Sequence, residues 1–227
     1  MHVEVHGRPS YALAYLFLNY EESAFVERGS IAALSEGMDV RGSLGGDGVV
    51  RAIKRKAFGD EPLVFTEVNA NIDRAWVAVA PPFPGDVQAV PLDGQTSLLI
   101  ETGALLAYST GVHSDVRYSG LKTVALHEGV VMIELTGTGL VVLSSYGAIE
   151  ESALADNESI IVDTGHLVGF TSTVTFDVGA LESITKSVVT GEGLVARLTG
   201  PGRIYLQTRA EQDLRSWLFP SREQVNR

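Results

Sequence analysis

The sequence LIETGAL at residues 99–105 returns as IVDTGHL at residues 161–167. The match extends without a gap from residues 85–116 to residues 147–178, at a constant offset of 62 positions. A weaker third copy, FVERGSI at residues 25–31, keeps the same order of an apolar run, an acid, a polar residue, a glycine and a second apolar run. Because a glycine between two apolar runs is typical of a tight turn or bulge between strands, the copies predict one strand–turn–strand unit used three times.

These units predict an all-β fold. The chain has 227 residues, a length at which β sandwiches and barrels still form one domain. Its 24 glycines and many valines and threonines favour strands joined by tight turns. We therefore expect a single domain over residues 1–227, with internal repeats at approximately 18–40, 85–116 and 147–178 that form pseudo-threefold β-layers around a shared core.

The remaining sequence predicts connectors and one helix. Residues 135–140 (LTGTGL) and 198–203 (LTGPGR) share a glycine pattern that predicts strand, turn and strand. The run Pro81–Pro84 predicts a rigid connector, because proline is excluded from central strands. Near the end, residues 213–218 place Leu214, Trp217 and Leu218 at helical spacing before Pro220. This pattern predicts a short C-terminal helix that caps the sheets.

Charge and composition limit the function classes. There are 17 basic and 28 acidic residues, a net charge of −11, whereas nucleic-acid-binding domains usually present a basic face. Nucleic acid is thus an unexpected partner. The absence of cysteine excludes disulfides and thiol chemistry and fits a reducing compartment. The N-terminal residues do not resemble a signal peptide, and the longest uncharged stretch, residues 135–149, is too short to span a membrane. We expect a cytoplasmic protein.

The repeat-equivalent acids Glu27, Glu101 and Asp163 are the first candidate site. Threefold symmetry could gather three carboxylates around one axis to hold a cation. The simpler alternative is that each acid accepts backbone hydrogen bonds within its own turn. His166 has Ala104 and Ser30 as its counterparts, so the repeat does not require it. It is a candidate ligand-pocket residue or general base, or else an ordinary loop histidine.

A second candidate site is the basic run of Arg51, Lys54, Arg55 and Lys56. Such a run could bind a phosphate, an anionic lipid surface or an acidic partner; it could equally be a solvated turn or a subunit contact. The sequence contains no GxSxG, HExxH or GxxxxGK[ST] motif. We therefore predict no catalytic site and no cofactor.

Three segments carry a resemblance to a known family. They are the basic run from Arg51, the segment Val162–Val168 (VDTGHLV), and Gly200–Gly202 leading to Leu206–Arg209 (LQTR). Together they resemble the family named for altered inheritance of mitochondria. The resemblance implies repeated β-layers similar to those of the tryptophan-RNA-binding attenuator protein, a double-stranded β-helix-like fold, and mostly uncharacterised prokaryotic relatives. Mitochondrial relatives are connected with membrane organisation. A likeness of fold does not carry function.

The sequence supports two alternative functions. The repeats and the absence of catalytic motifs favour a non-catalytic scaffold or interaction protein that forms a homo-oligomer, because association can bury exposed sheet edges. The alternative is a small-molecule or ion-binding module, or a cryptic enzyme, with a pocket between the β-layers that uses His166 and the three acids. Peripheral membrane contact through the basic run is a third hypothesis.

Overall fold

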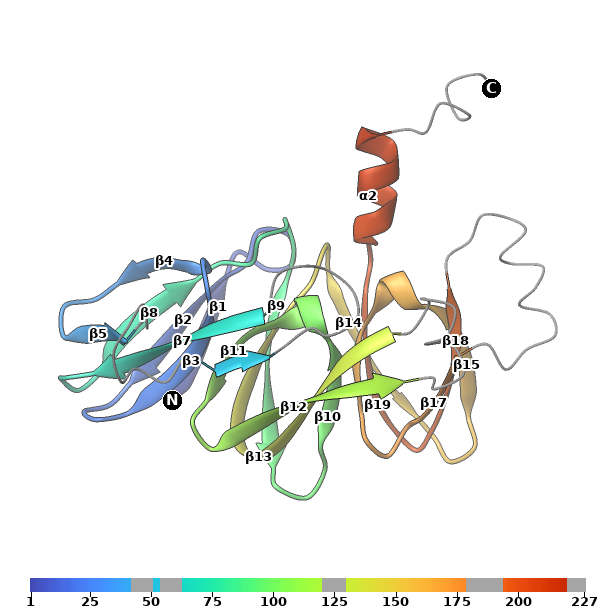
Figure 1. The fold of residues 1–227 in the computed structure, drawn as a ribbon, viewed down its shortest axis with the longest axis horizontal. Helices are drawn as coiled ribbons and strands as arrows, with labels where there is room; N and C mark the ends of the chain where they lie inside the picture. Colours follow the sequence, from blue (N-terminus) through green and yellow to red (C-terminus); the bar gives the residue numbers. More distant parts are fainter. Residues whose placement is uncertain (42–50, 54–62, 120–129, 179–193, 220–227) are drawn as a thin grey trace.

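The computed structural model describes residues 1–41, 51–53, 63–119, 130–178 and 194–219. Strands dominate, so the predicted all-β class is confirmed. They lie in three groups that follow one another in a row (Figure 1). The C-terminal helix α2 (Glu211–Leu218) stands away from the row.

The first group contains the N-terminal strands. They are β1 (His2–His6), β2 (Leu13–Leu18), β3 (Ser23–Glu27), β4 (Ile31–Leu34), β5 (Met38–Arg41), β6 (Arg51–Ile53), β7 (Leu63–Ala70) and β8 (Ala75–Val79). One four-stranded sheet has the order β1-β2-β8-β4, while β3, β5, β6 and β7 belong to a second, larger sheet. The alternation of buried and half-buried residues along β2 is the period-2 pattern of a strand with one face toward a core.

The middle and last groups each carry a 3₁₀ helix between two of their strands. The middle group holds β9 (Val87–Asp93), β10 (Leu98–Glu101), the 3₁₀ helix η1 (Thr102–Ala104), β11 (Leu105–Ser109), β12 (Val112–Ser119) and β13 (Val130–Ser144). The last group holds β14 (Ile149–Leu154), β15 (Ser159–Asp163), η3 (Thr164–His166), β16 (Leu167–Thr171), β17 (Thr175–Val178), β18 (Val195–Thr199) and β19 (Gly202–Gln207). Strands β15, β18 and β17 form a separate three-stranded sheet.

Two strand pairings join neighbouring groups. Strand β11 of the middle group pairs antiparallel with β3 of the first, and β16 of the last group pairs antiparallel with β10 of the middle. The pairing that would close a ring, between β15 and β4, is not among those of the described residues: there β4 pairs with β8 and β15 with β18. Among the residues that the structure describes, the expected closure around one shared core is therefore not formed. Instead, the buried apolar residues described there form three clusters.

The glycine-rich segment of residues 135–140 differs from its prediction. It lies inside the continuous strand β13, whereas the matching residues 198–203 do break into β18 and β19 as predicted. Residues 130–137 of β13 pair with β12, and residues 138–144 pair with β9. Gly137 has a positive φ of 96°, and a Cβ there would lie 2.3 Å from the carbonyl oxygen of Gly111. Glycine thus lets one strand change partners where another residue would clash.

The predicted helix is present as α2, but its predicted capping role is wrong. None of its residues is buried, and Trp217 is 77% exposed. The connector at Pro81–Pro84 lies between β8 and β9, outside any strand, as predicted. The assignment of one domain to residues 1–227 stays a prediction.

Candidate functional site

Glu101 and Asp163 occupy the same place in their turns. Each is the N-cap of a short 3₁₀ helix, η1 and η3 respectively. Glu101 Oε2 accepts a hydrogen bond from the Gly103 amide at 2.6 Å, and Asp163 Oδ1 accepts one from the Gly165 amide at 2.9 Å. A carboxylate at an N-cap satisfies backbone donors that the helix leaves without a partner. The local-turn alternative therefore describes both acids.

Glu27 lies in the third equivalent turn, which has no 3₁₀ helix. Its carbonyl oxygen accepts hydrogen bonds from the Ser30 amide at 3.1 Å and the Ser30 hydroxyl at 2.7 Å. Within the described ranges, which include Glu27, Glu101 and Asp163, no three histidine or carboxylate side chains are grouped to hold a metal ion. The structure thus does not bring the three acids together, because their turns belong to three successive groups of the row.

His166 borders a surface pocket of about 490 Å³. Its Nδ1 lies 2.8 Å from the backbone oxygen of Gln207, and because a carbonyl only accepts, Nδ1 must be the donor. Tyr146, Arg209, Asp213 and Trp217 line the same pocket. An imidazole, a carboxylate, a guanidinium group and two aromatic rings could together recognise a small polar molecule. The structure does not place Glu27, Glu101 or Asp163 in this pocket.

The basic run lies mostly beyond what the structure describes. Arg51 begins the short strand β6, which pairs with β7. Lys54, Arg55 and Lys56 fall outside the described residues. Their proposed contact with an anion, a partner or a membrane surface stays a prediction.

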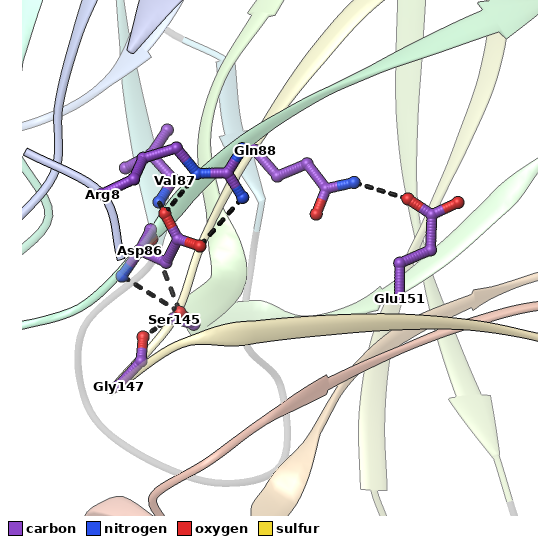
Figure 2. Close-up of polar contacts among 7 residues, drawn as sticks. All are labelled: Arg8, Asp86, Val87, Gln88, Ser145, Gly147 and Glu151. Atoms are coloured by element: carbon purple, nitrogen blue, oxygen red, sulfur yellow. Dashed lines mark hydrogen bonds and ion pairs between the residues drawn. The ribbon is translucent and has the colours of Figure 1, made fainter. Parts of the chain in front are cut away.

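Sequence reasoning missed an ion pair whose carboxylate is buried (Figure 2). The Asp86 side chain is 2% exposed and faces the half-exposed Arg8. Arg8 Nε and a terminal guanidinium nitrogen donate to the two Asp86 oxygens at 2.8 and 2.9 Å, a bidentate arrangement. The Val87 amide donates to Asp86 Oδ1 at 2.8 Å. The hydrogen bond to Asp86 raises the pKa of the Arg8 guanidinium above its ordinary value.

Backbone hydrogen bonds of Asp86 also link the start of the middle group to the start of the last group. Its amide donates to the Gly147 carbonyl at 2.9 Å, and its carbonyl accepts from the Ser145 amide at 3.1 Å. A Cβ on Gly85 would lie only 1.7 Å from the Ser145 oxygen, so glycine is required there. Gly85 and Gly147 form an isolated parallel bridge. These repeat-equivalent glycines thus lie side by side at the start of two successive units.

A second polar cluster lies beside this ion pair. Gln88 donates to Glu151 at 2.6 Å, as Figure 2 shows, and Glu151 also pairs with Arg203. These three residues and the buried Tyr205 line a pocket of about 390 Å³. Burial raises the pKa of the Tyr205 hydroxyl, with the nearby Glu151 charge as the next cause. Because the polar side chains already bond one another, the cluster fixes β14 against β9 and β19.

Residues 3–209 match the family model described as mitochondrial biogenesis AIM24. The chain belongs to that family. This confirms the family resemblance carried by the basic run, VDTGHLV and the Gly200–Arg209 segment. The match covers the three groups of strands and ends before α2.

Two streptococcal proteins are similar to this chain at low identity. An uncharacterised protein of Streptococcus pyogenes serotype M6 is 24% identical over 205 residues, which are 87% of this chain and 82% of that protein. A protein of known crystal structure from Streptococcus pyogenes is 20% identical in sequence to this chain. The structural match covers 96% of this chain and 97% of that protein, with a TM-score of 0.74. At this identity the likeness shows a shared fold. In the described residues, no helix has the length and apolar character to cross a bilayer.

Proposed function

We propose that this AIM24-family chain is a non-catalytic scaffold or interaction protein that works as a homo-oligomer. The observation that carries the proposal is the exposure of apolar side chains on strands at sheet edges. Leu34 on β4, Val40 on β5 and Ile161 on β15 are 38%, 45% and 58% exposed. Each of these strands ends the order of its sheet within the described residues. Edge strands of this kind are templates for pairing with another chain.

The first test is the oligomeric state of the full-length protein. We expect size-exclusion chromatography with multi-angle light scattering, at micromolar concentration, to show one defined oligomer. Association removes the exposed edges and apolar side chains from water, which gives it a driving force. Native mass spectrometry on the same peak should show no added small-molecule mass. A strictly monomeric peak would contradict the proposal.

A second candidate function is a small-molecule or ion-binding module. The pocket of about 490 Å³ beside His166 favours it, since its size and mixed polar and aromatic lining suit a small ligand. The same native mass spectrum separates the two proposals. A species that carries a reproducible extra mass, and that loses it after His166→Ala, would support the binding module.

A further inference from the structure

The two internal junctions between strand groups have the same register. In the first, Phe25 on β3 lies opposite Tyr108 on β11; in the second, Leu99 on β10 lies opposite Phe170 on β16. The equivalent turns begin at Glu27, Glu101 and Asp163, which are called the turn acids below. Phe25 and Leu99 each stand two positions before the turn acid of their own unit. Tyr108 and Phe170 each stand seven positions after the turn acid of theirs. The chain therefore uses one pairing rule twice.

The second strand of each unit also carries the same irregularity. Strands β4, β11 and β16 each pair on one edge with a neighbour in their own group, with a register shift after the first paired residue. Strands β11 and β16 use their other edge for the internal junctions. Within the described residues, β4 has no pairing on its other edge. Likewise β15, the equivalent of β3 and β10, pairs only with β18 there.

Strands β11 and β16, which have a paired strand on both edges, are more buried than β4, which has one on a single edge within the described residues. A missing partner strand predicts this difference. The first four residues of β11 and of β16 are all buried. In β4, three of the four residues are exposed and the other is half-buried. Phe25, Tyr108 and Phe170 are at most 4% exposed, whereas their end equivalents Ile161 and Leu34 are 58% and 38% exposed. The apolar side chains that would fill a third junction are present but uncovered.

From these equivalences we infer that β15 of one chain pairs antiparallel with β4 of a second copy, so that chains join head to tail. This inference rests on the proposed homo-oligomer and names the two edges that form it. The same register places Ile161 opposite the partner's Leu34. Ile161 stands two positions before Asp163, and Leu34 stands seven positions after Glu27. The two strands lie at opposite ends of the row, so the partner strand belongs to another chain (Figure 1).

The flanking pairs support the same register. Ile160 would face the partner's Ser35, as Leu98 faces Thr171 and Ala24 faces Ser109. Val162 would face the partner's Ala33, as Ile100 faces Gly169 and Val26 faces Ala107. Each position keeps its type of pair, an apolar residue against a hydroxyl or against a small residue. A shift by one residue would turn every side chain to the wrong face and lose this agreement.

The test uses two charged variants of the full chain, Ile161→Lys and Leu34→Lys, and light scattering with native mass spectrometry. Each variant alone should be monomeric at a concentration where the wild type is oligomeric, because an edge lysine opposes strand addition. Val40→Lys, on the edge strand β5 outside the predicted junction, is the matched control and should keep the wild-type mass. An equimolar mixture of the two edge variants should form a dimer, because one intact β15 and one intact β4 remain and both outer edges are blocked.

The outcomes separate the pairing from the proposed function. Dimer formation in the mixture supports head-to-tail pairing and shows that both variants are folded. Oligomeric wild type with both edge variants unchanged in mass would overturn the β15–β4 pairing while leaving the homo-oligomer in place. Loss of assembly in one edge variant with a dimer kept by the other variant alone would also overturn it, because a twofold contact between two identical edges behaves that way. A monomeric wild type would contradict the proposed function itself.

Discussion

Arg8→Ala is expected to lower the free energy of unfolding by about 1 to 3 kcal/mol, the usual cost of removing the partner of a buried polar group. Its partner Asp86 has a side chain that is only 2% exposed, so the carboxylate loses its charged partner and gains only the water that the shortened side chain admits. The Val87 amide would remain as a donor to Asp86, which offsets part of the cost. Chemical denaturation at neutral pH measures the difference.

The reverse replacement gives the matched control. Asp86→Ala leaves Arg8, whose side chain is 48% exposed and can be hydrated, so its cost should be smaller than that of Arg8→Ala. A larger loss for Asp86→Ala would contradict this asymmetry. It would mean that the hydrogen bond from Val87, rather than the uncompensated charge, dominates the energy of the pair.

Tyr108→Ala should destabilise the chain by about 3 to 5 kcal/mol through the first internal junction, the range for removing a large buried ring. Tyr108 is fully buried, and its ring lies 5.1 Å from that of Phe25 and 5.0 Å from that of Phe65. The loss removes two aromatic contacts and leaves a cavity between the first two groups. Equilibrium unfolding in urea measures it.

Tyr11→Ala is the control for this replacement, since the Tyr11 side chain is 78% exposed. It should change the free energy of unfolding by less than about 0.5 kcal/mol. If Tyr108→Ala were equally mild, the β3–β11 junction would not be part of the core, and its use as a template for a third junction would fail.

The repeat units could be predicted from sequence because their signal is local. The acid and the glycine of residues 101–103 and 163–165 stand two positions apart, and the structure shows the acid capping the turn that contains the glycine. The helix at residues 211–218 has a local signal as well. The position of this helix away from the sheets has no local sequence signal. Whether another part of the chain covers the apolar side of a helix depends on tertiary contacts.

The missed features all depend on contacts between distant residues. Arg8 and Asp86 are 78 positions apart, and nothing near either residue marks the other as its partner. Strand β13 runs through Gly137 because β9 and β12 take up its two halves, which a glycine pattern alone does not reveal. Ile161 and Leu34 read as ordinary core positions in their repeats, and only the pairing of the equivalent residues shows that they are uncovered.

Cysteine trapping tests the head-to-tail pairing most directly, because the natural chain has no cysteine. Directly opposite residues of antiparallel strands have Cα atoms roughly 4.5 to 5.5 Å apart, within the range that a disulfide bridges. Mild oxidation of the double variant Ile161→Cys/Leu34→Cys should therefore give a ladder of covalent multimers on a non-reducing gel. The pair Ile161→Cys/Val40→Cys should give none. Absence of the ladder from the first pair, or covalent dimers of Ile161→Cys alone, would contradict the β15–β4 pairing.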